Sequence, residues 1–206
     1  MIRSILFDLA EVYIRGMKGA EHEISVATGQ EPRTVWHAHL NVGELYELFR
    51  GGISEDRYWN AVIAAGNYPA QIAGQDAKKF FKATMRKNFT RIEGTEEVIR
   101  KLKAAGYTLG LISDHAREWI EYCEGEFPIR EFFDDVCYSF DTGHIKRDDA
   151  HNFTCSIESL GADPATTLFI DDNPKNFPGA RETGIAHLHH FKNASDLERY
   201  LTEQGL

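Results

Sequence analysis

The chain has 206 residues, of which 42% are hydrophobic, and a formal net charge of −9. This length suits one medium-sized domain or one domain with a smaller insert, and the composition is rich enough in apolar residues for a core. The acidic balance, with no cluster of Lys and Arg, argues against a protein that binds the phosphate backbone of nucleic acids. No apolar stretch is long enough to cross a bilayer, so we expect a cytoplasmic protein without a membrane partner. The three cysteines show no close pairing, which favours free thiols over disulfides or a thiolate metal site: Cys123, Cys137 and Cys155.

The first predicted element is a strand in the apolar run 5–12, ending at Asp8. A short apolar run without a polar face is typical of a strand that is buried in a parallel sheet. The run is therefore predicted as a core strand and not as a signal peptide.

Residues 19–88 show helical signals and no convincing strand. Helices are predicted at 21–27, from 32, around 45–49, after the N-cap Ser54 and at 76–86. A helical stretch of this length is too long for an ordinary crossover. We therefore predict a helical cap domain, residues 15–89, inserted into a core domain of residues 1–14 and 90–206. The sequence leaves open whether Trp36 and Trp59 pack in a core or face a partner, and whether the protein is a monomer or a homodimer.

The rest of the chain alternates strands and helices. Strands are predicted at 107–112, 135–138, 167–170 and 186–188, and helices at 95–102, 119–124, 149–160, through 180 and at 194–201. Such alternation implies right-handed crossovers, so the predicted fold is α/β, a doubly wound, Rossmann-like parallel sheet of five strands.

Polar side chains follow several predicted strands. Asp8 ends the first, Ser113 ends the second, Lys146 lies in a Gly-containing turn, and Asp171 and Asp172 end the fourth. In open α/β sheets the carboxyl ends of the strands are where ligands bind. Each residue alone also has a simpler interpretation, as a turn residue, a helix N-cap or a solvated lysine. Together, in this order, they resemble the four motifs of the haloacid dehalogenase-like (HAD) hydrolase superfamily, across nearly the whole chain.

The resemblance implies an Mg²⁺-dependent phosphomonoester hydrolase that acts on a small phosphorylated metabolite. Asp8 would be the nucleophile that forms an aspartyl-phosphate. The family pattern places the metal on Asp8, the backbone carbonyl of Ala10 and Asp172, with Asp171 as a supporting or water-bridged partner; hard oxygen ligands of this kind suit Mg²⁺.

The phosphate-binding residues that the resemblance implies are Ser113, through its hydroxyl, and Asp114, through its backbone N–H at the start of the next helix. Lys146 would pair with the phosphate and with Asp8, and Asn176 would be an orienting residue. The family usually has Pro after this lysine, whereas this chain has Arg147.

Ala10 departs from many HAD phosphatases, which carry a second Asp there to protonate the leaving group. Such help is worth roughly a hundred- to ten-thousandfold in rate. A small residue here resembles the capped subfamily I members that include sugar-phosphate phosphatases and the epoxide hydrolase N-terminal domain. Glu11, His37 or His39 are candidate substitutes for the acid.

Two alternative functions stay open. A haloacid dehalogenase uses the same Asp nucleophile without a metal, although the acidic pair favours the phosphatase. A catalytically weak binding or regulatory protein would retain the fold and the metal site. A transition-metal site at His187, His189 and His190 is a weaker interpretation than a strand end and a solvated turn.

Overall fold

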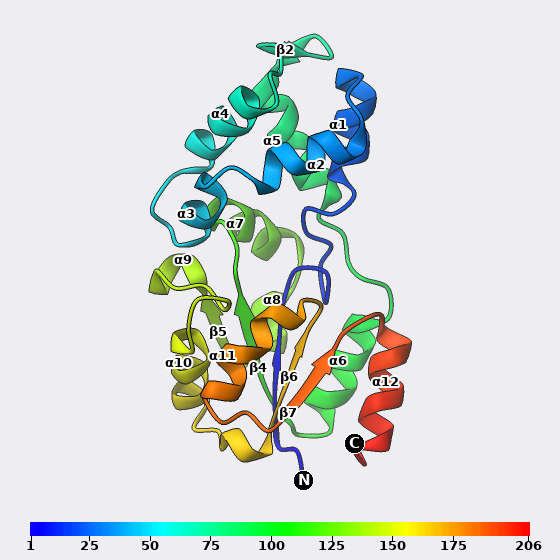
Figure 1. Ribbon diagram of the computed structural model, residues 1–206. Helices are drawn as coiled ribbons and strands as arrows, with labels where there is room; N and C mark the ends of the chain where they lie inside the picture. The colour runs from blue at the N-terminus through cyan, green and yellow to red at the C-terminus, as the bar shows by residue number, and fades with distance from the viewer.

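A computed structural model describes residues 1–206 as a five-stranded parallel sheet with a helical region at one end (Figure 1). The strands are β1 (Ser4–Phe7), β4 (Thr108–Ser113), β5 (Asp135–Tyr138), β6 (Thr167–Asp171) and β7 (His187–His190), in the order β5-β4-β1-β6-β7. In the central strand β1, Phe7 pairs with Leu111 of β4 and with Ile170 of β6. The predicted α/β fold with a parallel five-stranded sheet is confirmed.

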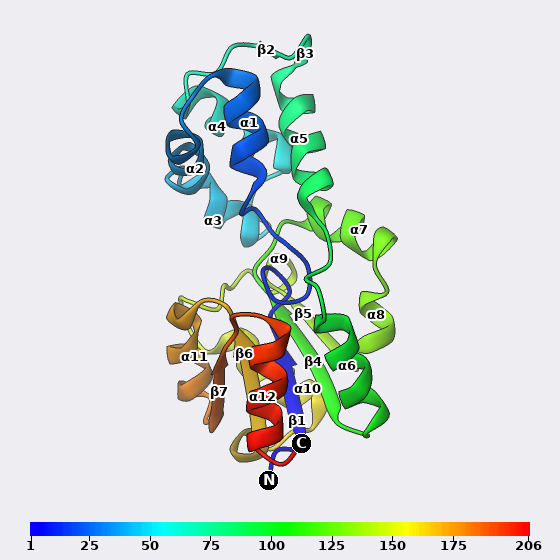
Figure 2. The ribbon, with the colours of Figure 1, turned by 90° about the vertical axis from the view of Figure 1, so that its right-hand side faces the viewer.

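Helices cover both faces of the sheet, and Figure 2 shows α6 and α11 on opposite sides of it. The helices of this part are α6 (Thr95–Ala104), α7 (Arg117–Glu126), α8 (Ile129–Phe132), α9 (Ser139–Thr142), α10 (His151–Leu160), α11 (Phe177–Glu182) and α12 (Ala194–Glu203), with 3-10 turns at Pro164–Thr166 and Pro174–Asn176. Because side chains alternate along a strand, Ile5 and Phe7 join the larger hydrophobic cluster, whereas Leu6 packs with Phe153 of α10.

The helical region, residues 20–88, lies beyond the carboxyl ends of the strands, and both chain termini lie at the opposite end of the molecule (Figure 1). It contains α1 (Ala20–Thr28), α2 (Pro32–Leu40), α3 (Glu44–Phe49), α4 (Glu55–Ala65) and α5 (Ala77–Asn88). As predicted, Ser54 caps α4, because its side chain accepts a hydrogen bond from the Arg57 backbone N–H.

The prediction of no strand between residues 19 and 88 is wrong. A short antiparallel hairpin joins α4 to α5, with strands β2 (Gln71–Ile72) and β3 (Gln75–Asp76). Ala73 and Gly74 form its turn with φ of 50° and 75°. Two-residue strands are too short to show an alternating pattern, so the sequence gives no signal for them.

One hydrophobic cluster of 43 buried residues joins the helical region to the sheet. Trp59 of α4 belongs to it and is fully buried, so an interface role for Trp59 is excluded in this structure. Trp36 of α2 is half-buried and lies outside the cluster. None of the helices combines the length and the apolar character that crossing a membrane requires.

Candidate active site

Three adjacent strands bring the predicted site residues to one edge of the sheet. Asp8 directly follows β1, Ser113 ends β4 and Asp171 ends β6. The Asp8 backbone N–H donates to the Ile170 carbonyl (2.9 Å), which continues the β1–β6 ladder to this edge. Carboxylate oxygens of Asp8, Asp171 and Asp172 consequently lie within 4.8 Å of one another.

Lys146 projects into this group from the loop after α9. Its buried Nζ lies 2.7 Å from Asp8 Oδ1 and 2.9 Å from Asp171 Oδ2, and it donates to the Ile112 carbonyl at 3.3 Å. The Lys146 backbone N–H donates to the carboxylate of Asp114, with both oxygens at 3.1 Å. The loop is therefore anchored at both the main chain and the side chain of Lys146.

Arg147 follows in place of the proline that is usual in the family. Its guanidinium lies 5.0 Å from the centre of the Tyr46 ring, and it donates to the Tyr46 hydroxyl. Arg147 thus connects the loop that carries Lys146 to helix α3.

Burial and neighbouring charges raise the pKa values of Asp8, Lys146 and Asp114. Burial raises the pKa of Asp8 well above its ordinary value, against the lowering effect of Lys146. Burial lowers the pKa of Lys146, but Asp171, Asp8 and Asp114 outweigh it, so the net shift is upward and the ammonium stays charged. Burial raises the pKa of Asp114 to about 6, again opposed by Lys146.

The donor set suits a hard divalent cation. Asp171 already accepts from Lys146 Nζ, Asn176 Nδ2 (2.9 Å) and the Asn173 backbone N–H (2.7 Å). Asp172 is half-exposed, and its only side-chain partner is Lys18 Nζ at 2.7 Å. Three clustered carboxylates beside one buried ammonium leave excess negative charge, and their oxygens are ligands that Mg²⁺ prefers.

Ser113 Oγ is buried and has no hydrogen-bond partner within the protein. The alternative interpretation of Ser113 as a helix N-cap is wrong, because α7 begins at Arg117 with Ala116 at its N-cap position. For the same reason Asp114 precedes the helix and does not open it. A buried hydroxyl without a partner at the edge of the sheet is free to donate to a ligand oxygen.

A cavity of about 410 Å³ opens onto this edge. It is lined by Ala10, Glu11, Gly16, Met17, Lys18, Trp36, Phe49, Asp114, His115, Trp119, Asp172 and Asn173. Of the three candidate substitutes for the acid, only Glu11 lines this cavity. Its Oε1 accepts from the Gly16 backbone N–H (2.9 Å), and burial raises its pKa.

The two histidines of α2 lie elsewhere. His37 lines a separate hollow with Thr34 and Asn41, and His39 is buried against Trp59 and Phe81. Neither is among the residues that line the Asp8 cavity.

The histidines of β7 also lie apart from the acidic group, except for one contact. His190 Nε2 lies 3.0 Å from the Asp172 carbonyl, and His189 Nε2 lies 3.5 Å from Asp196.

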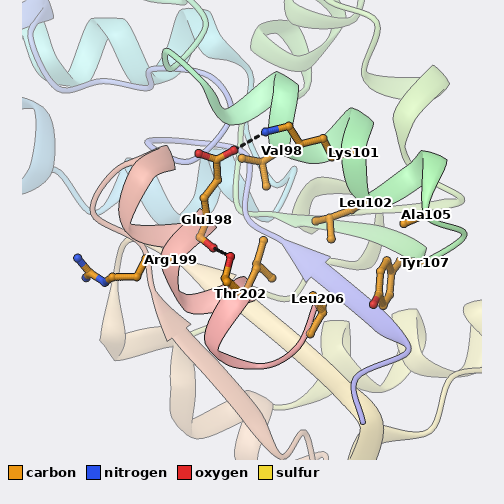
Figure 3. Close-up of a pocket in the computed structure, with 10 residues that line it drawn as sticks. Val98, Lys101, Leu102, Ala105, Tyr107, Glu198, Arg199, Thr202 and Leu206 are labelled. Atoms are coloured by element: carbon orange, nitrogen blue, oxygen red, sulfur yellow. Dashed lines mark hydrogen bonds and ion pairs between the residues drawn. The ribbon is translucent and has the colours of Figure 1, made fainter.

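A second hollow of about 440 Å³ lies between α6 and α12 (Figure 3). Its wall is mostly apolar, with Val98, Leu102 and Leu206 pointing inward and a Lys101–Glu198 ion pair at 2.6 Å. It shares no residue with the cavity at the acidic edge.

Sequence reasoning missed Lys18 and the aromatic wall of the cavity. Lys18 meets Asp172 across 154 positions of sequence, and Trp36 and Phe49 reach the cavity from α2 and α3. No local pattern marks these residues, because their position depends on how the helical region packs over the sheet.

A family model described as haloacid dehalogenase-like hydrolase matches residues 53–189. The chain belongs to this family. Its solved neighbours of similar fold include the HAD family enzyme BT-2542 of Bacteroides thetaiotaomicron, with a TM-score of 0.74, 20% identity, and coverage of 97% of this chain and 98% of that one. A predicted HAD-like hydrolase of Porphyromonas gingivalis gives a TM-score of 0.71 at 21% identity, with 99% and 98% covered.

Two curated relatives of this HAD-like chain match part of it. Pyrophosphatase PpaX of Bacillus cereus (strain G9842) is 30% identical over 92 residues, which are 45% of this chain and 42% of PpaX. Flavin mononucleotide hydrolase 1 of Arabidopsis thaliana is 25% identical over 125 residues, 61% of this chain and 50% of that protein. The matches thus span half or less of each relative.

Proposed function

We propose that the protein is an Mg²⁺-dependent phosphomonoester hydrolase that acts on a small phosphorylated metabolite through Asp8. The observation that carries the proposal is the arrangement around Asp8, whose Oδ1 is held by the Lys146 ammonium at 2.7 Å beside two further carboxylates. The unpartnered Ser113 hydroxyl ends the neighbouring strand.

In this proposal Asp8 attacks the phosphorus atom. The bond to the leaving alcohol breaks, an aspartyl-phosphate forms, and water then releases inorganic phosphate and restores the carboxylate. Ser113 Oγ donates to a phosphate oxygen, and the Lys146 ammonium neutralises charge and orients Asp8. Mg²⁺ held by Asp8, the Ala10 carbonyl and Asp172 would supply further positive charge; Asp171 and Asn176 would position Lys146 and the loop.

The comparisons support the reaction class. The relatives are a pyrophosphatase and a flavin mononucleotide hydrolase, and BT-2542 has been solved in complex with magnesium and inorganic phosphate (TM-score 0.72, 20% identity, 94% of this chain and 96% of that one). We place the chain in the capped subfamily I, near the sugar-phosphate phosphatases, on the small residue at position 10. In this proposal residues 15–89 are the cap domain and residues 1–14 and 90–206 the core domain.

The catalytically weak binding protein is the second candidate, and Ala10 is the observation that favours it. Such a protein would hold Mg²⁺ and phosphate without rapid turnover. The haloacid dehalogenase has less support, because that chemistry needs no cation and gives the Asp172 carboxylate beside Asp8 no role.

The test is phosphate release from a panel of sugar phosphates, nucleotides and aryl phosphates, with and without Mg²⁺. We expect Mg²⁺-dependent turnover in the wild type and a loss of at least about a thousandfold in Asp8→Asn, which removes the nucleophile. Asp141→Asn is the control, because Asp141 is an exposed carboxylate that pairs with Arg117. If neither the wild type nor Asp8→Asn releases phosphate, although the wild type binds Mg²⁺, the result would favour the binding protein.

A further inference from the structure

The cavity above Asp8 has an aromatic wall in addition to its acidic residues. Trp36 comes from α2, Phe49 ends α3, and His115 and Trp119 come from the segment after β4. Three of these rings form a packed cluster, with centroids 6.2 Å apart for Phe49–Trp119 and 5.4 Å for His115–Trp119. In the proposed reaction Asp8, Ser113 and Lys146 hold the phosphoryl group at the edge of the sheet, so the aromatic wall is left to contact the leaving group.

Trp36 is the unusual member of the wall. Trp59 and Trp119 are buried and donate their indole N–H groups to Glu55 Oε1, at 3.0 and 2.8 Å. Trp36 makes no side-chain hydrogen bond, stacks on no other ring, and lies outside both hydrophobic clusters although it is half-buried. A large rigid ring that lines a cavity without a partner of its own offers a stacking face to a ligand.

Most polar side chains that line the cavity have a partner within the protein, although the buried His115 Nδ1 has none. Lys18 Nζ pairs with Asp172, Glu11 Oε1 accepts from Gly16 N, and Asn173 Oδ1 accepts from the Lys175 backbone N–H (3.2 Å). A polyol would therefore regain only a few of the hydrogen bonds that it loses to water. The charged residues that line the cavity are mostly acidic, which disfavours a second phosphate on the leaving group.

We propose that the leaving group of the substrate is a planar, uncharged aromatic ring that stacks on Trp36 against the wall of Phe49. This inference rests on the proposed phosphatase function and names its substrate class. A cavity of about 410 Å³ admits a ring of one or two cycles together with the phosphoryl group. Trp36 then determines specificity for aromatic over saturated leaving groups.

The experiment compares benzyl phosphate with cyclohexylmethyl phosphate, because the two leaving alcohols are similar in size and acidity and only one is planar. We expect the wild type to favour the benzyl ester in kcat/KM by at least about fivefold, the lower range of aromatic stacking energies. In Trp36→Ala that ratio falls towards one, mainly through a higher KM for the benzyl ester, and Trp36→Phe retains most of it.

The matched control is His37→Ala, the next position of α2, whose side chain is exposed and lines a different hollow. This variant keeps the wild-type ratio. Equal use of the two esters by the wild type, a ratio that survives in Trp36→Ala, or a clear preference for glucose 6-phosphate would overturn the inference while leaving a phosphatase.

A binding measurement distinguishes failure of the aromatic-ring inference from failure of the proposed phosphatase function. Benzylphosphonate and cyclohexylmethylphosphonate are titrated into wild type and Trp36→Ala with Mg²⁺ by calorimetry, which needs no turnover. A preference for benzylphosphonate that depends on Trp36 supports the aromatic site even in a protein that hydrolyses nothing. Absence of that preference overturns it, whatever the turnover.

Discussion

Ala10 places a methyl group at a position of the cavity where many phosphatases of this family carry an acid. Its neighbour Glu11 has a positive φ of 59°, and Glu11 Oε1 accepts a hydrogen bond from the Gly16 backbone N–H. The Glu11 carboxylate therefore points along the loop. Gly16 packs close beside Ala10, since a Cβ on Gly16 would lie 3.1 Å from the Ala10 Cβ. A longer side chain at position 10 must therefore extend into the cavity.

We predict that Ala10→Asp raises kcat for alkyl phosphates, up to about a hundredfold, because the new carboxyl can protonate a poor leaving group and then activate water. The gain is smaller for 4-nitrophenyl phosphate, whose leaving group needs little protonation. Steady-state kinetics on the two substrate classes measures the difference. An unchanged rate in Ala10→Asp, together with a large loss in Glu11→Gln, would instead identify Glu11 as the existing acid.

At the scale of elements, one buried carboxylate joins the helical region to helix α7, which follows β4. Glu55 begins α4, and its Oε1 accepts the indole N–H groups of Trp59 in α4 and Trp119 in α7. Its Oε2 lies 3.2 Å from Arg86 and 3.4 Å from Lys82, both on α5. Three helices thus meet at a carboxylate with only 2% of its side chain exposed.

We predict that Glu55→Gln lowers the free energy of unfolding by about 2 kcal/mol, since a charge-assisted contact to two half-exposed cations is lost while an indole acceptor remains. The control is Asp56→Asn, the next residue of α4. Asp56 also pairs with Lys82 but is 58% exposed, so its change should stay within about 0.5 kcal/mol. Urea unfolding measures both, and equal losses would point to the charge of the helix N-terminus and not to the buried contact.

The parallel five-stranded sheet and the edge that carries Asp8 could be predicted because buried parallel strands are apolar runs whose carboxyl ends share one edge. The order of the strands was not predicted. The contacts of Glu55 could not be predicted, since a charged residue in a first helical turn normally faces solvent. The same holds for Trp36, whose environment depends on how α2 lies above the sheet. The positions of helices and strands can be predicted from local sequence, whereas the residues that form the aromatic wall of the cavity depend on packing between distant segments.

At the scale of the whole molecule, the helical region and one face of the sheet share a single hydrophobic core. Val35 and Phe81 belong to the same cluster as Ile5 and Leu168. Because apolar burial is continuous between them, we expect the chain to unfold in one cooperative transition. Stability can then be measured with one probe, which makes its pH dependence informative.

His39 gives that pH dependence a definite sign. It is buried edge-on to Trp59 and Phe81, its Nε2 has no partner, and burial lowers its pKa from 6.5 to about 4. The unfolded chain therefore binds a proton below pH 6.5 that the fold does not, so stability falls as pH drops from 6.5 to 4 and the loss saturates below that range. The expected loss is up to about 3 kcal/mol. We predict that His39→Phe weakens the pH dependence of urea-unfolding stability across this window, whereas His37→Phe, at an exposed position of the same helix, leaves the wild-type slope. The same slope in His39→Phe would assign the dependence to other groups, His115 among them, whose pKa burial also lowers to about 4.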